Sequence, residues 1–363
     1  MKIYIVTFFG GNYGSILQAY ALQSKLREFG ASPVIISERK PKKKSSKLLS
    51  LWRIIRPEKH YSILQMLQRH LQRKDFGVKR QKLLQFVRTN LPVKDIVDRE
   101  DFIRCLSPQD VFLAGSDQIW NVLNRPLSDW YSLRWIGDKY KKYSYAASIG
   151  LSSLTKKQEK EYSIGLSGFQ TISLREGQAV KALFPIFPDK VRQDLDPTLL
   201  YSSSFWRSIE SKRLSEEPYV FVYILRPDKR VVEIAKKVAK EKNCKTIYTG
   251  NYSYKYEDVQ TVCDAGIEEF LSYIDHAEAV VTNSFHGTAF SVLFEKPFLS
   301  VKIASTSSRM ESLLDLLGLT SQLVGDVNRD YSLKIDYVHP KSVLEKQRER
   351  SLDYLRNICQ YRI

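Results

Sequence analysis

Cysteine is scarce in this sequence of 363 residues. The four cysteines are Cys105, Cys244, Cys263 and Cys359, and they lie far apart with no CxxC pair among them. Zinc sites and disulfide frameworks both depend on closely spaced cysteines, so neither is expected. Free thiols in a reducing compartment are the simpler interpretation.

Long apolar runs are also lacking. None approaches the roughly 20 residues that a membrane-spanning helix needs. Residues 1–8 have the pattern of a strand and are too short for the apolar region of a signal peptide. We therefore expect a cytoplasmic protein. A hydrophobic content of 43% is typical of a folded chain, and the length predicts two domains.

Acidic residues are few between residues 39 and 88, where 16 Lys or Arg stand against only Glu58 and Asp75. The formal net charge of the chain is +17, and most of the excess lies in this insertion of about residues 39–90. Within residues 40–56, apolar side chains recur at helical spacing beside basic ones. A helix of this kind suits an anionic membrane surface, or it packs on its own domain with a solvated basic face. Nucleic acid is not expected, because no helix-turn-helix, zinc-finger or aromatic RNA-binding pattern accompanies the charge.

The chain opens with a strand at residues 3–8, a glycine-containing turn, a helix at residues 15–29 and a strand at residues 33–37. The turn does not have the GxGxxG spacing of dinucleotide-binding enzymes, and no GxxxxGK[ST] motif occurs. Predicted strands and helices continue to alternate through both halves of the chain, and this pattern predicts an α/β fold with two parallel sheets. We expect domains at residues 1–200 and 201–340, a linker at residues 201–218, and a terminal helix at residues 341–363 that packs back on the first domain.

Polar side chains follow two predicted strands of the first half. Residues 115–121 come after a short buried strand and include Asp117, Trp120 and Asn121, a set that suits a sugar because an indole stacks on C–H groups while the others bond hydroxyls. Ordinary turn chemistry is the alternative. Arg175 and Glu176 follow the strand at residues 171–174, where a guanidinium could grip a carboxylate or phosphate or form a surface pair.

His286 follows a strand of the second half and opens a helix at residues 285–294. Strand ends of this kind bind ligands in α/β sheets, and helix starts attract anions. Gly287 would let a ligand approach the backbone closely. A structural histidine remains the alternative from these residues alone. Arg309 lies in the first turn of a later helix, where a cation is unfavourable unless an anion is bound nearby.

Six segments resemble, in order, the motifs of the polysaccharide pyruvyl transferase family. They are residues 12–23, 114–121, 173–176, 196–198, 282–287 and 308–311. The resemblance implies two Rossmann-like domains similar to the glycosyltransferase-B architecture, with the active site in the interdomain cleft. It also implies phosphoenolpyruvate as donor and two hydroxyls of a sugar as acceptor, on a surface polysaccharide such as a capsule or exopolysaccharide, or on its polyprenyl-diphosphate-linked precursor.

The resemblance also implies roles for individual residues. His286 matches the family's general acid/base and Arg175 its donor-binding arginine. The remaining donor-side candidates are Ser284, Phe285, Gly287 and Arg309. On the acceptor side the candidates are Asn12, Tyr13, Gly14, Gln18, Ser116, Asp117, Trp120 and Asn121. Some members of the family have an arginine where this chain has Ser284, so Arg309 or Arg226 would have to supply the second guanidinium.

The chemistry implied requires no metal and no cofactor, because protons and fixed positive charge suffice. Galactose bridged at its 4- and 6-hydroxyls is the product typical of the family. A position at the inner face of the cytoplasmic membrane, through residues 40–56, would bring the cleft to a lipid-linked acceptor. The alternatives are a glycosyltransferase of the same architecture that uses a nucleotide sugar, and a non-catalytic carbohydrate-binding protein at the membrane surface.

Overall fold

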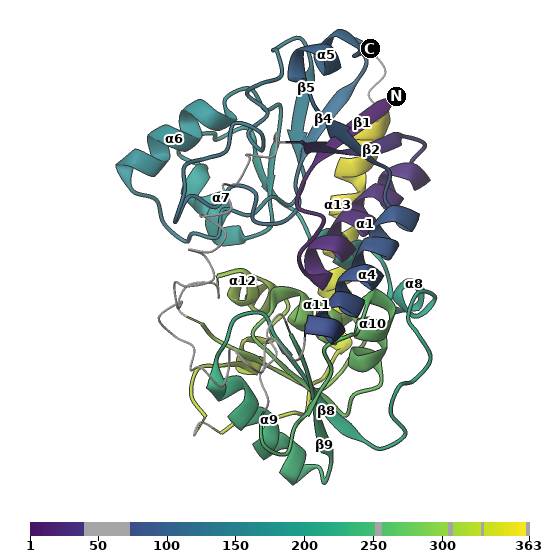
Figure 1. The fold of residues 1–363 in the computed structure, drawn as a ribbon. Coiled ribbons are helices and arrows are strands. Elements are labelled where there is room, and N and C mark those ends of the chain that lie inside the picture. The colour runs from purple at the N-terminus through teal and green to yellow at the C-terminus, as the bar shows by residue number, and fades with distance from the viewer. Residues whose placement is uncertain (40–72, 251–255, 304–307, 328–329, 361–363) are drawn as a thin grey trace, which may run out of the picture.

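The computed structural model describes residues 1–39, 73–250, 256–303, 308–327 and 330–360. Two parallel sheets, each flanked by helices, form its upper and lower halves in Figure 1. The predicted α/β class with two parallel sheets is therefore confirmed. None of the described helices combines the length and the apolar character that a membrane crossing requires.

The first sheet has five parallel strands in the order β3-β2-β1-β4-β5. The strands are β1 (Lys2–Val6), β2 (Ser32–Glu38), β3 (Val93–Ile96), β4 (Val111–Ala114) and β5 (Lys141–Ser144). All four residues of β4 are buried, as expected when helices cover both faces of a parallel sheet. The strand order reverses between β1 and β4, and in α/β sheets the carboxyl ends at such a reversal form a ligand-binding crevice.

The second sheet has six parallel strands in the order β10-β9-β8-β11-β12-β13. They are β8 (Tyr219–Ile224), β9 (Lys245–Gly250), β10 (Gln260–Thr261), β11 (Ala279–Thr282), β12 (Phe298–Val301) and β13 (Leu323–Val324). Its order reverses between β8 and β11, so the turn after β11 occupies the place that the turn after β4 has in the first sheet. A pair of shorter strands, β6 (Ile172–Leu174) and β7 (Val191–Gln193), extends the first half beside β5.

Helices connect the strands of both sheets. In the first half they are α1 (Tyr13–Glu28), α4 (Arg73–Asn90), α5 (Arg99–Arg104), α6 (Lys156–Leu166) and α7 (Gly177–Leu183). Later in the chain come η1 (Pro197–Leu200), α8 (Ser203–Arg207), α9 (Lys229–Glu241), α10 (Ile267–Asp275), α11 (Phe285–Leu293), α12 (Ser308–Leu316), η2 (Thr320–Gln322) and α13 (Val338–Gln360). The basic stretch at residues 40–56 lies outside the described residues, and α4 is the described part of the predicted insertion.

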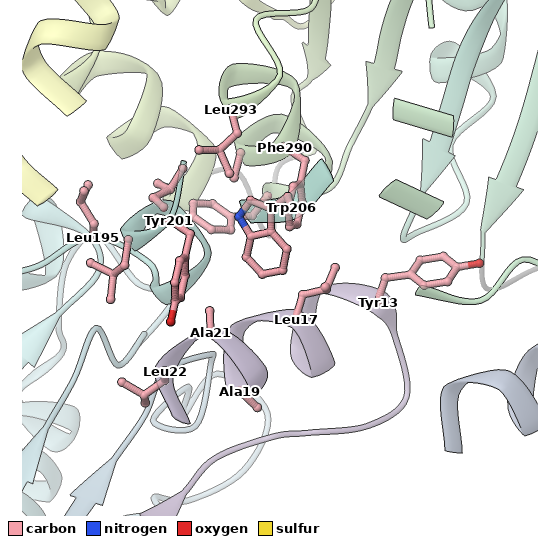
Figure 2. Close-up of a cluster of buried hydrophobic side chains, with 14 of the residues drawn as sticks. Tyr13, Leu17, Ala19, Ala21, Leu22, Leu195, Tyr201, Trp206, Phe290 and Leu293 are labelled. Carbon is pink, nitrogen blue, oxygen red and sulfur yellow. The ribbon is translucent and has the colours of Figure 1, made fainter. Parts of the chain in front are cut away.

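The two halves share one apolar core, which Figure 2 shows where α1 meets the segments around Trp206 and Phe290. The Tyr13 ring stacks on Phe270 of α10 with ring centroids 4.3 Å apart. Trp206 is fully buried and meets Phe290 of α11 edge to face at 5.1 Å. The predicted linker at residues 201–218 is thus more than a connection, because its helix α8 contributes the central indole of the contact. Burial of this much aromatic surface holds the sheets in one relative position.

Helix α13 returns to the first half of the chain. The Tyr354 hydroxyl donates to the Ser144 carbonyl oxygen of β5 at 2.9 Å, and the Arg192 guanidinium lies 4.1 Å from the centre of the Tyr354 ring. The helix starts at Val338, a few residues before the predicted start at residue 341. These contacts are those expected of a terminal helix packed on the first domain, while the domain boundaries themselves stay a prediction.

Candidate active site

His286 lies where the two halves meet. Ser284 lies two residues after the end of β11 and caps α11, its Oγ accepting from the Gly287 amide at 3.4 Å, so His286 falls in the first helical turn. Its ring packs against Gly14 in the first turn of α1: a β-carbon built on Gly14 would lie only 2.0 Å from Nδ1 of His286. The first domain thus has room for the imidazole because residue 14 lacks a side chain.

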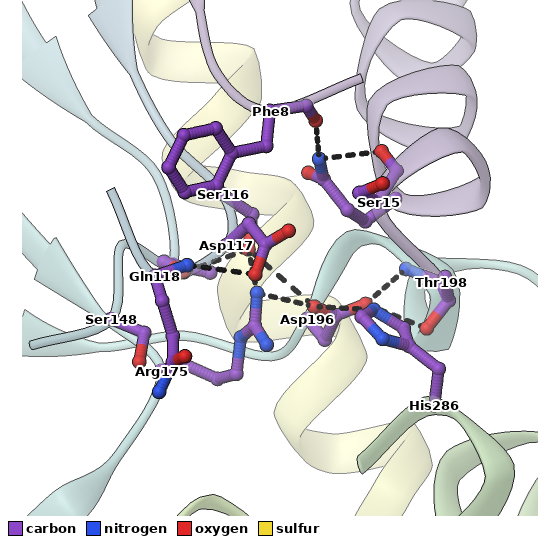
Figure 3. A network of polar contacts seen from close by, with 12 residues as sticks. Phe8, Ser15, Ser116, Asp117, Gln118, Ser148, Arg175, Asp196, Thr198 and His286 are labelled. Atoms are coloured by element: carbon purple, nitrogen blue, oxygen red, sulfur yellow. Dashed lines mark hydrogen bonds and ion pairs between the residues drawn. The ribbon is translucent and has the colours of Figure 1, made fainter. Parts of the chain in front are cut away.

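Asp196 links His286 to Arg175 at the centre of this contact (Figure 3). Its Oδ2 lies 2.9 Å from Nη2 of Arg175 and 3.7 Å from Nε2 of His286. Its Oδ1 accepts from the amide and the hydroxyl of Thr198, at 3.0 and 2.6 Å. Burial alone would raise the pKa of the Asp196 carboxyl, but the charges of Arg175 and His286 outweigh burial and hold the pKa well below its ordinary value. Asp196 is therefore a buried anion beside a guanidinium and an imidazole.

Arg175 has more hydrogen-bonding capacity than the protein uses. It leaves the end of β6, and its Nη2 donates to the Ser116 hydroxyl at 2.6 Å as well as pairing with Asp196. The guanidinium carbon lies 4.7 Å from the centre of the Phe285 ring, within reach of a cation–π contact. Nε and Nη1 are buried without a partner. A buried N–H group without an acceptor is costly, so these two nitrogens favour the entry of an anion.

Arg309 brings a second guanidinium to the same region from the first turn of α12. It is buried, and its Nε has no partner. Burial and the nearby charge of Arg175 lower the pKa of Arg309, while Asp117 and Glu176 act in the opposite direction. Arg226, after β8, also contributes a positive charge that lowers the pKa of Arg309. The positive charges of Arg175 and Arg226 thus both act on Arg309.

Glu176 is a second buried acid whose charge interacts with these cations. Its Oε1 accepts from the Ser148 hydroxyl at 2.5 Å, whereas its Oε2 has no partner. Burial raises the pKa of this carboxyl, and Arg175, Ser148 and Arg309 reduce the effect without cancelling it. A small cavity of about 20 Å³ also touches both Arg175 and Arg309, which is room for about one water molecule.

Three residues expected to bind the acceptor are buried in structural roles. Trp120 is fully buried, donates from Nε1 to the Tyr131 carbonyl oxygen at 2.9 Å, and packs on Phe169, so it has no free face for a sugar. Tyr13 is also fully buried, and its hydroxyl donates to the Ala265 carbonyl oxygen. Both rings complete apolar cores, and contacts of Trp120 and Tyr13 with the acceptor stay a prediction.

Gln18 is the third. It is fully buried, and its Nε2 donates to the Phe8 carbonyl oxygen at 2.6 Å and to the Ser15 carbonyl oxygen at 2.9 Å. The amide therefore holds the turn between β1 and α1 in shape. A contact of Gln18 with the acceptor stays a prediction.

The other acceptor-side candidates lie closer to the surface or to the catalytic groups. Asn12, Asp117 and Asn121 are half-buried, and Asn12 caps α1 by accepting from the Ser15 amide. Ser116 and Gly14 contact Arg175 and His286 rather than open space. Asn12, Asp117 and Asn121 are therefore the more accessible of the acceptor candidates.

Gly287 does not have the role expected from the sequence. A β-carbon on Gly287 would lie 2.4 Å from Oγ1 of Thr282, whose hydroxyl donates to the Tyr223 carbonyl oxygen. The missing side chain makes room for the protein's own threonine, not for a ligand. Phe285, by contrast, lies in the site, under the Arg175 guanidinium.

Asp196 was not among the candidate site residues. It lies in one of the six recognised segments, after β7, and only the packing of η1 against α1 and α11 brings it to Arg175 and His286. A buried Asp-Pro-Thr turn after a strand was the available signal. Glu176 was noted only as a partner of Arg175.

One group of possible metal ligands occurs among the described residues. Glu210, Asp275 and His276 place three ligand atoms within 4.8 Å of one another. Asp275 already pairs with Arg207 through two contacts of 2.8 Å. The Arg207 guanidinium would therefore compete with a metal ion for this carboxylate. None of these residues belongs to the constellation around His286.

The contact between Gly14 and His286 gives a direct test. Replacing Gly14 by alanine should displace the imidazole and lower the turnover number about a hundredfold, a loss typical of a misplaced catalytic group. Gly137→Ala is the matched control, because nothing lies within 4 Å of a β-carbon at Gly137. Circular dichroism would verify the fold of both variants. An undiminished rate for Gly14→Ala would show that the position of the ring against α1 has no bearing on function.

Comparisons with known proteins agree with this architecture. The family model for polysaccharide pyruvyl transferase matches residues 12–305. Curated proteins give no significant sequence match. Among solved structures, UGT89C1 of Arabidopsis thaliana in complex with UDP-L-rhamnose is similar with 11% identity, 99% coverage of each chain and a TM-score of 0.52.

UDP-GlcNAc 2-epimerase from Methanocaldococcus jannaschii is similar with 11% identity and a TM-score of 0.50, covering 95% of this chain and 99% of that one. Identity this low establishes the fold alone, and that fold is the expected glycosyltransferase-B architecture. The family match extends over most of the chain and includes His286, Arg175 and Asp196. The chain therefore belongs to the polysaccharide pyruvyl transferase family.

Proposed function

We propose that this chain transfers a pyruvyl group from phosphoenolpyruvate to two hydroxyls of one sugar, forming a ketal and releasing phosphate. The observation that carries the proposal is the presence of buried, unpartnered guanidinium nitrogens on both sides of one small cavity: Nε and Nη1 of Arg175 and Nε of Arg309. Such groups are stabilised by an anion that arrives with its own acceptors. Family membership supplies the kind of reaction.

The donor side of the site suits phosphoenolpyruvate. Its carboxylate and phosphate carry more negative charge than one guanidinium neutralises, and Arg175 and Arg309 approach from different halves of the chain. The planar fork of an arginine binds carboxylate and phosphate oxygens in pairs. Asp196 already pairs with Arg175, so the buried Nε of Arg309 is a further donor for an incoming anion.

His286 is proposed to move the proton. Protonation of the methylene carbon of the donor leaves a cationic centre at the neighbouring carbon, to which the first sugar hydroxyl adds. Loss of phosphate and addition of the second hydroxyl complete the ketal. The two protons released by the hydroxyls balance the one gained by the methyl group and the one that leaves with phosphate. An imidazole is the side chain that most often acts as a general acid or base near neutral pH, and Asp196 lies 3.7 Å from Nε2 of this one.

The acceptor is proposed to lie on the side of the first sheet, near Asn12, Asp117 and Asn121. Amide and carboxylate groups bond sugar hydroxyls well. The sugar belongs to a bacterial surface polysaccharide or to its polyprenyl-diphosphate-linked precursor, and a 4,6-ketal of galactose is the first product to test. Attachment to the inner face of the membrane through residues 40–56 stays a prediction.

Two measurements test this function. Phosphoenolpyruvate should raise the melting temperature, since a ligand at a hundred times its Kd stabilises by about 2.7 kcal/mol, whereas UDP-sugars should not. Incubation with phosphoenolpyruvate and a panel of lipid-linked sugars should then give free phosphate and a pyruvate adduct by mass spectrometry. Stabilisation by a UDP-sugar alone would instead indicate a glycosyltransferase.

A further inference from the structure

A groove runs between helix α4 and the turn that joins β1 to α1. Its volume is about 490 Å³, within the range of small-molecule binding sites. The apolar part of its lining consists of Phe9, Ile16, Leu83, Leu84 and Val87. Leu84 is 42% exposed, which is unusual for a leucine beside a hollow of this kind. We call this feature the α4 groove.

The α4 groove has a cationic side. Lys79 and Arg80 of α4 line it together with the apolar residues. Lys79 donates to the Gly250 carbonyl oxygen at 3.0 Å and lies over the Tyr13 ring, which fixes its position, while Arg80 is exposed. Among the described residues that line the groove, none is acidic. An apolar trough with cations at one side suits a ligand that has an apolar chain and an anionic head.

The floor of the groove is the turn at Gly10 and Gly11. A β-carbon on either glycine would meet nothing within 4 Å, and Gly11 has a φ of +87°. Bare backbone therefore faces the groove, and phosphate oxygens can approach its N–H groups closely. Gly14 comes three residues after Gly11, in the first turn of α1, and lies against His286. A head group held at Gly10 and Gly11 would direct whatever is attached to it along Asn12 toward the imidazole.

We propose that the α4 groove binds the isoprenyl diphosphate carrier of the saccharide acceptor, with the diphosphate at Arg80 and the Gly10–Gly11 backbone and the chain on Leu83, Leu84 and Val87. This inference rests on the proposed function, because the carrier matters only if a saccharide is delivered to the site. Charge favours this occupant over a neutral lipid, and the proximity to His286 favours it over a regulatory amphiphile.

Farnesyl diphosphate is the soluble probe for this site. Isothermal titration calorimetry with the full chain should show binding, with farnesol and inorganic diphosphate each much weaker because each lacks one half of the ligand. Leu84→Asp should weaken binding about ten- to a hundredfold, the loss expected for one buried leucine contact. Arg80→Ala should weaken it about tenfold through the lost charge-assisted bond.

Matched controls separate the groove from general effects. Leu214→Asp changes a leucine of nearly equal exposure, 43%, in another part of the chain, and Arg88→Ala removes a cation of α4 that does not line the groove. Both should bind farnesyl diphosphate like the unchanged protein. Equal affinity of Leu84→Asp and Leu214→Asp, or no binding of farnesyl diphosphate at all, would overturn the proposal. Equal binding of dodecyl phosphate would overturn the isoprenyl assignment.

Each variant would also be tested for the rise in melting temperature with phosphoenolpyruvate. Leu84→Asp should keep this rise, because its side chain is remote from Arg175 and Arg309. If farnesyl diphosphate binds the α4 groove but phosphoenolpyruvate changes the melting temperature of neither the unchanged protein nor any variant, the proposed function fails. The assignment of the α4 groove as a binding site for the diphosphate would then still hold. If phosphoenolpyruvate stabilises and farnesyl diphosphate does not bind, only the groove proposal fails.

Discussion

Replacing His286 by glutamine should lower the turnover number for pyruvyl transfer about 10²- to 10⁴-fold, the contribution typical of a positioned acid/base group. Glutamine retains a polar side chain of comparable length but does not titrate. The contact of the ring with Gly14 and its approach to Asp196 place His286 at the centre of the site. Phosphate release from phosphoenolpyruvate in the presence of acceptor would measure the rate.

His286→Gln should lose turnover without losing the binding of phosphoenolpyruvate. The rise in melting temperature with phosphoenolpyruvate should persist in His286→Gln, because Arg175 and Arg309 are unchanged. His339→Gln, at an exposed position on α13, should keep the full rate. A rate for His286→Gln within a factor of three of the unchanged protein would remove His286 from the mechanism.

Replacing Asp196 by asparagine should lower the free energy of unfolding by about 3–5 kcal/mol, because it leaves a buried guanidinium without its counter-charge. The side chains of Asp196 and Arg175 are 0% and 3% exposed, so water cannot substitute for the lost partner. Urea unfolding followed by tryptophan fluorescence would measure the loss. Asp101→Asn, which breaks an exposed pair with Arg104, should change stability by less than about 1 kcal/mol.

The effect of Asp196→Asn should depend on pH in one direction. The folded-state pKa of Asp196 is held below its ordinary value of 3.8, so its stabilisation is complete above about pH 5 and declines as the pH falls below 4. The difference in stability between the two proteins should therefore narrow in acid. A difference that is constant from pH 7 to pH 3 would mean that the carboxylate is not stabilised by the cations around it.

The strand ends could be predicted from the sequence because their signals are local. Buried runs such as residues 279–282, followed by small polar residues and helical spacing, predict the turn that carries His286 whatever the rest of the chain does. Arg175 and Arg309 could be placed for the same reason, each at the start of a helix. The carboxyl ends of neighbouring parallel strands meet at one edge, so the approximate site follows from the topology.

Burial could not be predicted in the same way. Trp120 and Asn121 are adjacent in a polar turn, yet one is fully buried against Phe169 and the other is half-buried. Which of the two faces the cleft depends on residues about fifty positions away. The surroundings of Gly287 could not be predicted from the sequence either. The space beside its backbone is filled by the Thr282 side chain rather than by a ligand.

By itself, then, the sequence determined the α/β class, the alternation of strands and helices, the positions of His286 and Arg175 at strand ends, and, through six motifs in order, the family. These depend on periodicity and on residue types within short windows. Only the tertiary structure decided that Asp196 joins Arg175 to His286, that Gly14 makes room for the imidazole, and that Tyr13 and Gln18 are buried within the fold. Those outcomes depend on which distant segments pack together, and side-chain burial and charge pairing are properties of that packing.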